Sequence, residues 1–179
     1  MFGRISEAYT VRRFWGRYWH QLIRHSFQSC SAVTIKVCRI PRGTVLSSQT
    51  QVWIAFLLSG LGHAQGLLML PWPTKTSLLS KTHGTMMFFL WQALMISCED
   101  ALHILYQKHG MGLGPLSHRL RALGYLWVLL AFWISIPWVA DNLLRAGLLT
   151  ASRDGFSPLL EIQSSLQNLL ARLRQERSM

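Results

Sequence analysis

Residues 52–70 read VWIAFLLSGLGHAQGLLML, the apolar centre of a run without charged residues that extends from Gly43 to Thr74. The hydrocarbon core of a bilayer is about 30 Å thick, and roughly 20 helical residues cross it. Pro71 and Pro73 follow the apolar segment, and the residue before a proline tends to leave the helix. The sequence therefore predicts a transmembrane helix over 52–70.

Two further apolar stretches follow this segment. Residues 85–106 are apolar apart from Glu99 and Asp100, and residues 122–140 contain no charged side chain. A glycine-rich loop, GMGLGP, lies between them and lacks the spacing of a dinucleotide-binding motif. We predict an all-α integral membrane protein with about three transmembrane helices, at 52–70, 85–106 and 122–140.

Amphipathic segments are expected at both ends of the chain. At the carboxy terminus, Ser157 and Pro158 form a plausible helix start. They precede apolar residues at helical spacing: Leu159, Ile162, Leu166, Leu169 and Leu173. The pattern predicts interfacial amphipathic helices at both ends, and it divides the chain into a membrane unit, 1–147, and a carboxy-terminal helix, 148–179.

Composition separates the classes of protein that remain. The chain has 179 residues, only 14% of them charged, and a net charge of +11. This excludes a disordered chain. A net positive charge is typical of proteins that bind nucleic acid or anionic lipid. The long uncharged runs favour the lipid bilayer as the partner, and we expect no binding of nucleic acid. Three cysteines without paired spacing, and no His/Cys cluster, predict no metal site.

The distribution of basic residues predicts the orientation. Residues 1–42 and the 106–121 loop hold 11 Lys and Arg, whereas the 71–84 loop and the carboxy-terminal segment hold 7. Cytoplasmic loops carry the excess of basic residues. The amino terminus is therefore expected in the cytosol.

The first candidate site is the run FWGRYWHQLIR, residues 14–24. On one continuous helix, its basic side chains would share a face: Arg13, Arg17, His20 and Arg24. One interpretation is an interfacial anchor, with arginines on lipid phosphates and aromatic rings at headgroup depth. The other is a basic surface that faces a phosphorylated substrate.

The second candidate is His63, in the middle of the uncharged run. An ionisable side chain at such depth usually faces protein or a water-filled cavity. Ser59 lies one turn earlier on the same face, and three glycines nearby permit close approach of a helix or a ligand: Gly60, Gly62 and Gly66. The alternatives are a histidine satisfied by a neighbouring helix and, less well supported, a Ser59–His63 nucleophile and base.

The third candidate is Glu99, which shares a helical face with Gln92 and His103. One interpretation is a buried polar network that joins helices, in which Glu99 pairs with His103 and both face protein. The other is that Glu99 orients a catalytic group or lines a pocket.

Four motifs in this order resemble one family. FWGRYWHQ, FLLSGLGHAQG, FFLWQALMISCEDALHILYQ and RALGYLWVLLAFWISIPW are similar to the wax-synthase-like membrane-bound O-acyltransferases, in particular the fungal acetyltransferases of terpenoids and other secondary metabolites. The resemblance covers residues 8–147 and only the carboxy-terminal half of the family. Relatives often carry an acidic residue where this chain has Ala64.

The resemblance implies transfer of an acyl group from acyl-CoA to a hydroxyl of a small molecule. Acetyl-CoA is the expected donor, and no tightly bound cofactor is expected. His63 would be the general base, and His20 with Trp19 would hold the reactants or stabilise the oxyanion. Arg13, Arg17 and Arg24 would contact the CoA phosphates, with Ser59 and Glu99 in the pocket.

The uncharged runs Gly43–Thr74 and Ala122–Ala140 lead us to expect an integral membrane protein of the endoplasmic reticulum, and two alternative functions stay open. Because the chain resembles only half of the family's length, a partner chain could supply the missing helices. The alternatives are a non-catalytic truncated protein or subunit with a structural role, and wax-ester synthesis from a long-chain alcohol.

Overall fold

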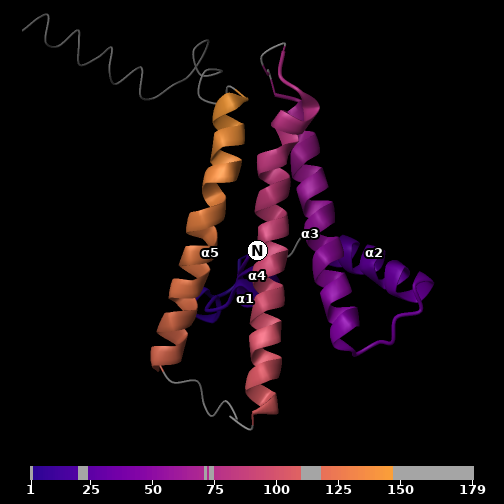
Figure 1. The fold of residues 1–179 in the computed structure, drawn as a ribbon, viewed down its shortest axis with the longest axis vertical. Coiled ribbons are helices and arrows are strands. Elements are labelled where there is room, and N and C mark those ends of the chain that lie inside the picture. The colour runs from indigo at the N-terminus through magenta and orange to yellow at the C-terminus, as the bar shows by residue number, and fades with distance from the viewer. Residues whose placement is uncertain (1, 20–23, 71, 73–74, 110–117, 147–179) are drawn as a thin grey trace, which may run out of the picture.

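The computed structural model describes residues 2–19, 24–70, 72, 75–109 and 118–146, and every regular element among these residues is helical. Three short turns begin the chain, and four helices follow (Figure 1). The turns are η1 (Ile5–Glu7), α1 (Val11–Arg13) and η2 (Phe14–Tyr18), and the helices are α2 (Arg24–Val37), α3 (Val45–Leu68), α4 (Leu78–Lys108) and α5 (His118–Arg145). The all-α prediction agrees with this part of the chain.

The three long helices lie side by side, with α4 between α3 and α5, and α2 projects from the outer side of α3 (Figure 1). The three predicted apolar segments fall on these helices, but α3 and α4 begin seven residues earlier than 52 and 85. Polar caps account for the extension. The Thr44 hydroxyl accepts from the backbone N–H of Ser47, and the Ser77 hydroxyl accepts from that of Ser80, both at 3.2 Å.

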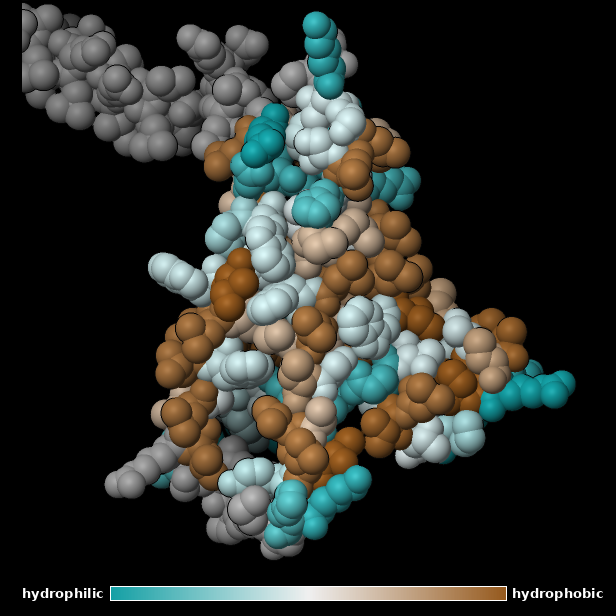
Figure 2. Space-filling model, viewed as in Figure 1, coloured by the Kyte–Doolittle hydropathy of each residue, from teal (hydrophilic) through white to brown (hydrophobic). Residues whose placement is uncertain are grey.

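Two of the described helices are long and apolar enough to cross a membrane, Leu78–Lys108 and Leu120–Arg145. Large apolar side chains cover the outside of α5, where Leu129 is 67% and Trp133 is 79% exposed. Figure 2 shows brown surface over much of the helices and teal side chains gathered near the ends. Helix α3 is not one of these two, so a third span remains a prediction.

The amino-terminal segment is not the continuous helix that the basic stripe required. Helix α1 passes into the π-helical turn η2, and Trp19 is extended, with φ −64° and ψ 150°. Arg13 and Arg17 are therefore not on one regular helix with Arg24, where α2 begins. We call residues 2–19 the N-terminal arm. The predicted helix over 148–179 lies outside the described residues.

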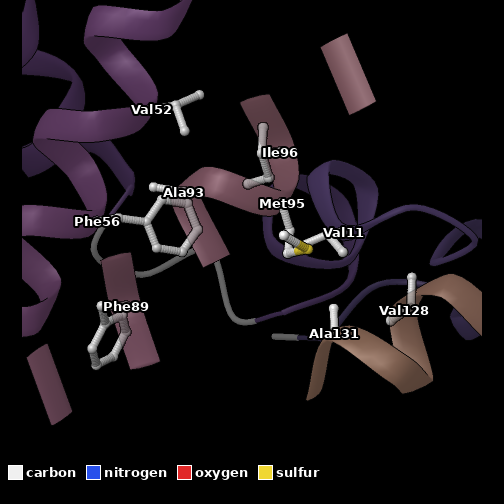
Figure 3. Packing of buried hydrophobic residues seen from close by; sticks show 9 residues of the cluster. All are labelled: Val11, Val52, Phe56, Phe89, Ala93, Met95, Ile96, Val128 and Ala131. Carbon is white, nitrogen blue, oxygen red and sulfur yellow. The ribbon is translucent and has the colours of Figure 1, made fainter. Parts of the chain in front are cut away.

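The core joins the arm to all three long helices. Figure 3 shows Val11 of the arm, Val52 and Phe56 of α3, Ala93 and Met95 of α4, and Val128 and Ala131 of α5 converging in one cluster. Val11 and Ala93 are completely buried. The arm is thus an integral part of the packed structure.

Glycines set the closest contacts between helices. A Cβ atom at Gly84 of α4 would lie 2.2 Å from the backbone oxygen of Trp138 in α5, and one at Gly60 of α3 would lie 3.1 Å from the Met86 sulfur. The expected close approach is therefore present at Gly60. Gly62 and Gly66 have no atom within 4 Å of such a Cβ.

Gly84→Ala should destabilise the packing of α4 on α5, because the backbone of α5 must move to admit the methyl group. We expect a loss of about 1–3 kcal/mol, the usual range for overpacking. Gly62→Ala is the matched control: it adds a methyl group in open space, and alanine favours a helix by about 0.8–1.0 kcal/mol over glycine. Unfolding in detergent measures both, and equal stability of the two variants would contradict the packing argument.

Candidate active site

A cavity of about 720 Å³ opens between the N-terminal arm and the three long helices. Its wall is largely aromatic and aliphatic, with Trp15 and Trp19 from the arm, Phe56 from α3, Phe88 from α4 and Phe132 from α5. The few polar contributors include Arg12, Gln51, Ser59, His63 and Thr85. An apolar cavity with a few polar groups is the usual form of a small-molecule site.

His63 lines this cavity from one face of α3. That face also contributes Val52, Phe56, Ser59 and Leu67, which follow the helical period of 3.6 residues. The imidazole packs against Phe89 of α4, with 4.7 Å between the ring centroids. Two of the sequence-predicted site residues, Ser59 and His63, therefore meet at one cavity wall.

The hydrogen bond of His63 defines its tautomer. Its Nδ1 lies 2.8 Å from the backbone oxygen of Ser59. A carbonyl oxygen only accepts, so Nδ1 carries the proton and Nε2 holds the free lone pair of the neutral ring. Ser59 thus contacts His63 through its backbone, and Nε2 is the atom that can accept a proton.

Trp15 forms the centre of an aromatic cluster on the cavity wall. Its ring contacts Trp19 at 5.8 Å, Phe56 at 5.5 Å and Phe132 at 5.9 Å between centroids. Its indole Nε1 donates to the Oε1 of buried Gln92 at 3.2 Å. Gln92 then donates from Nε2 to the Ser135 hydroxyl at 2.9 Å, so a polar chain through α4 fixes this ring.

Glu99 of α4 binds the N-terminal arm. Its Oε1 accepts from the backbone N–H of Val11 at 2.6 Å, and its Oε2 accepts from that of Arg12 at 3.0 Å. The expected pairing with His103 was wrong: His103 is exposed, and the carboxylate turns to the first N–H groups of α1, which have no partner within the helix. Glu99 faces protein, as expected, and does not line the cavity.

The neighbouring Asp100 completes this attachment. Arg12 donates from Nε to Oδ1 at 2.9 Å and from Nη2 to Oδ2 of Asp100. Gln49 of α3 donates from Nε2 to Oδ2 at 2.6 Å, and its own Oε1 accepts from the Ser97 hydroxyl at 2.6 Å. The arm, α3 and α4 are thus joined through one carboxylate.

The other predicted basic residues lie elsewhere. The Arg13 guanidinium stacks 4.4 Å from the centroid of the Tyr9 ring, and exposed Arg17 forms an ion pair with Glu7 at 3.1 Å. Neither lines the cavity, whereas Trp19 does. His20 and the side chain of Arg24 lie outside the described residues.

Sequence reasoning missed Arg12, Trp15 and Thr85 as cavity residues. Trp15 belongs to the quoted aromatic motif, so the signal for it was present. Arg12 precedes the stripe that helical spacing selected, and its partner Asp100 is 88 residues away. Nothing in the local sequence distinguishes Thr85 from the other helical threonines.

Comparison with known proteins adds independent information. Residues 1–91 match the sequence profile described as the membrane bound O-acyl transferase family. The chain is 32% identical over 140 residues to acetyltransferase sirH of Emericella nidulans. These residues cover 76% of this chain and 29% of the relative. It is 36% identical over 155 residues to acetyltransferase ple2 of Rhodocybe pseudopiperita, covering 82% and 37%.

A third relative, acetyltransferase eriL of Hericium erinaceus, is 33% identical over 152 residues, which cover 83% of this chain and 36% of the relative. The chain therefore spans about a third of the length of these curated relatives. No solved structure matches the chain.

Glu99→Ala should release the N-terminal arm. The variant leaves two backbone N–H groups without their charged acceptor, and hydrogen bonds to charged groups contribute roughly 1.5–3 kcal/mol each. We expect trypsin to cleave after Arg12, Arg13 or Arg17 at least about tenfold faster in the detergent-solubilised chain. His103→Ala, one turn later on α4 and exposed, is the control, and equal cleavage rates in both variants would show that Glu99 does not hold the arm.

Proposed function

Because the chain belongs to the membrane bound O-acyl transferase family, we propose that it transfers an acyl group from acyl-CoA to the hydroxyl of an apolar small molecule in the cavity beside His63. The observation that carries this proposal is the position of His63. Its Nδ1 faces the Ser59 carbonyl oxygen, which leaves Nε2 as the nitrogen that can accept a proton, in the wall of an otherwise largely apolar cavity. Imidazole is the side chain best suited to proton transfer near neutral pH.

The proposed reaction is a direct attack without an acyl-enzyme. His63 Nε2 takes the proton of the acceptor hydroxyl as its oxygen bonds to the thioester carbonyl carbon. The carbon–sulfur bond then breaks, and the CoA thiolate leaves with the proton from His63. Ser59 stabilises the imidazolium through its backbone oxygen, which holds Nδ1–H at 2.8 Å.

We assign acetyl-CoA as the donor and a terpenoid or related secondary metabolite as the acceptor. The names of the relatives, all acetyltransferases, support the acetyl group. The aromatic wall around Trp15 and a volume of about 720 Å³ suit a bulky apolar acceptor. Synthesis of wax esters from a long-chain alcohol is the alternative for the same site.

Trp19 and His20 are proposed to hold the reactants or the developing oxyanion, and Arg13, Arg17 and Arg24 to contact the CoA phosphates. Trp19 supports the first assignment because it lines the cavity. Arg17, two residues before Trp19, is exposed, so a charged ligand can reach it. This exposure supports the assignment of the arginines to the CoA phosphates. A guanidinium forms strong paired hydrogen bonds with phosphate.

The setting proposed for the reaction is the endoplasmic reticulum membrane, with the amino terminus in the cytosol. The basic excess of residues 1–42 and 106–121 supports this orientation. A partner chain that completes the chamber is part of the proposal, and a non-catalytic membrane subunit is the competing role.

His63→Gln tests the enzymatic proposal. Glutamine keeps polarity and approximate size but cannot accept the hydroxyl proton, and removal of a general base typically reduces the rate about 10²- to 10⁴-fold. Microsomes that contain the chain are assayed for transfer from radiolabelled acetyl-CoA to a panel of terpenoid and fatty alcohols. At most about 1% of the transfer should remain.

The matched control is His103→Gln, an exposed histidine on α4 outside the cavity. It should retain wild-type transfer at equal expression. If His63→Gln keeps most of its activity, His63 is not the base. If the wild-type chain transfers no acyl group, alone or together with full-length relatives, the structural role takes the place of the enzymatic one.

Arg17→Gln tests the assignment of the basic side chains. It should raise the KM for acyl-CoA and leave kcat within a few-fold, because loss of uniform binding affects KM alone. The rise in KM should shrink in high salt, since Arg17 is exposed and its interactions are screened. A fall in kcat at constant KM would instead place Arg17 at the reacting centre.

A further inference from the structure

Thr85 carries a buried hydroxyl without a hydrogen-bond partner among the described residues. The residue is 3% exposed, and its Oγ1 contacts neither solvent nor a polar atom at bonding distance. Thr85 lies in the first half of α4 and lines the same cavity as His63. Burial of an unpaired hydroxyl is unfavourable, so this atom requires an explanation.

The other threonines in the described helices are all satisfied locally. Each donates to the backbone oxygen four residues earlier: Thr34 to Cys30 at 3.1 Å, Thr50 to Leu46 at 2.8 Å and Thr82 to Leu78 at 3.0 Å. This is the usual partner of a helical threonine. Thr85 differs from them although it lies in the same helix as Thr82.

Asn142 of α5 explains the difference. Its side-chain Nδ2 donates to the backbone oxygen of Lys81 at 3.1 Å, and Lys81 is the residue four before Thr85. In an α-helix the same oxygen also accepts from the N–H of Thr85. A carbonyl oxygen has two lone pairs, so both are engaged, and the Thr85 hydroxyl is left for another partner.

The position of Thr85 relates it to the proposed base. His63 packs on Phe89, and Thr85 precedes Phe89 by one helical turn, a rise of about 6 Å along α4. Val139 and Leu143 of α5 line the cavity as well. Among the polar residues of the cavity, His63 and Thr85 thus lie on adjacent helices.

We propose that the Thr85 hydroxyl, which has almost no accessible surface in the structure, turns towards the cavity when the acceptor binds and pairs with a second oxygen of that molecule, so that the preferred acceptor is a hydroxy ketone or a diol with an apolar ring system. The proposal rests on the proposed function and specifies its substrate class. A threonine hydroxyl can donate to a ketone, or donate to and accept from an alcohol. A simple long-chain alcohol would leave Thr85 unpaired in the complex, which disfavours it relative to an oxygenated ring system.

The test compares matched pairs of probes that differ by one oxygen. They are 5α-androstan-3β-ol with 3β-hydroxy-5α-androstan-17-one, and 2-decalol with a hydroxydecalone, which place the ketone at two distances from the hydroxyl. Binding to the full chain in detergent is measured by ligand-induced thermal stabilisation, and transfer from acetyl-CoA by kcat/KM. The wild-type chain should prefer the hydroxy ketone of at least one pair by about 3- to 10-fold, the contribution of one hydrogen bond.

Three variants locate this preference. Thr85→Val keeps the shape of the side chain without the hydroxyl, and it should abolish the preference for the hydroxy ketone over the mono-alcohol. Thr85→Ser should restore the preference. Thr82→Val, three residues earlier, removes a hydroxyl that already has a partner and should retain the wild-type preference.

Equal affinity of the wild-type chain for both members of each pair overturns the proposal, whether or not Thr85→Val folds. A preference that persists in Thr85→Val overturns it too, because the second oxygen would then bind elsewhere. The binding measurement separates this failure from that of the proposed function: a Thr85-dependent preference in binding without acyl transfer keeps the oxygen site and removes the enzymatic role.

Discussion

Two adjacent carboxylates in an apolar helix hold the rest of the structure together. Glu99 binds backbone N–H groups of the N-terminal arm, and Asp100 binds the Arg12 guanidinium and Gln49 of α3. A charged group in a helix apolar enough to cross a membrane is stable only when protein groups compensate it, and here each oxygen has a donor. The arm that these bonds fix supplies Trp15 and Trp19 to the cavity wall, so the shape of the candidate site depends on them.

The cavity combines a wide apolar wall with polar atoms at separate points. His63 is oriented by its own helix, through the Ser59 carbonyl, whereas Trp15 is oriented by Gln92 and Ser135 from the other two long helices. The proposed base and the surrounding wall therefore have independent supports.

The sequence predicted those features that depend on local periodicity. Apolar runs, uncharged apart from Glu99 and Asp100, located α3, α4 and α5, and the helical spacing of Ser59 and His63 placed them on one wall. It could not predict partners far along the chain, because Glu99 and Arg12 are 87 residues apart and no local pattern relates them. The sequence also predicted Arg13 and Arg17 on a regular helix, which was wrong. The π-helical turn η2 and the extended Trp19 depend on tertiary contacts, among them Phe14 on Phe132, which local periodicity does not reveal.

The separation between the arm and its acceptors also orders events during synthesis. The ribosome makes residues 2–19 before their acceptors, since Glu99 and Asp100 follow Val11 and Arg12 by 87–88 residues, and the α5 residues that contact Tyr9 and Phe14 come later still. The aromatic segment must therefore wait outside its final position until α4 and α5 are in place. The arm cannot dock before α4 and α5 have been synthesised, so the cavity wall that Trp15 and Trp19 form is completed only after both helices exist.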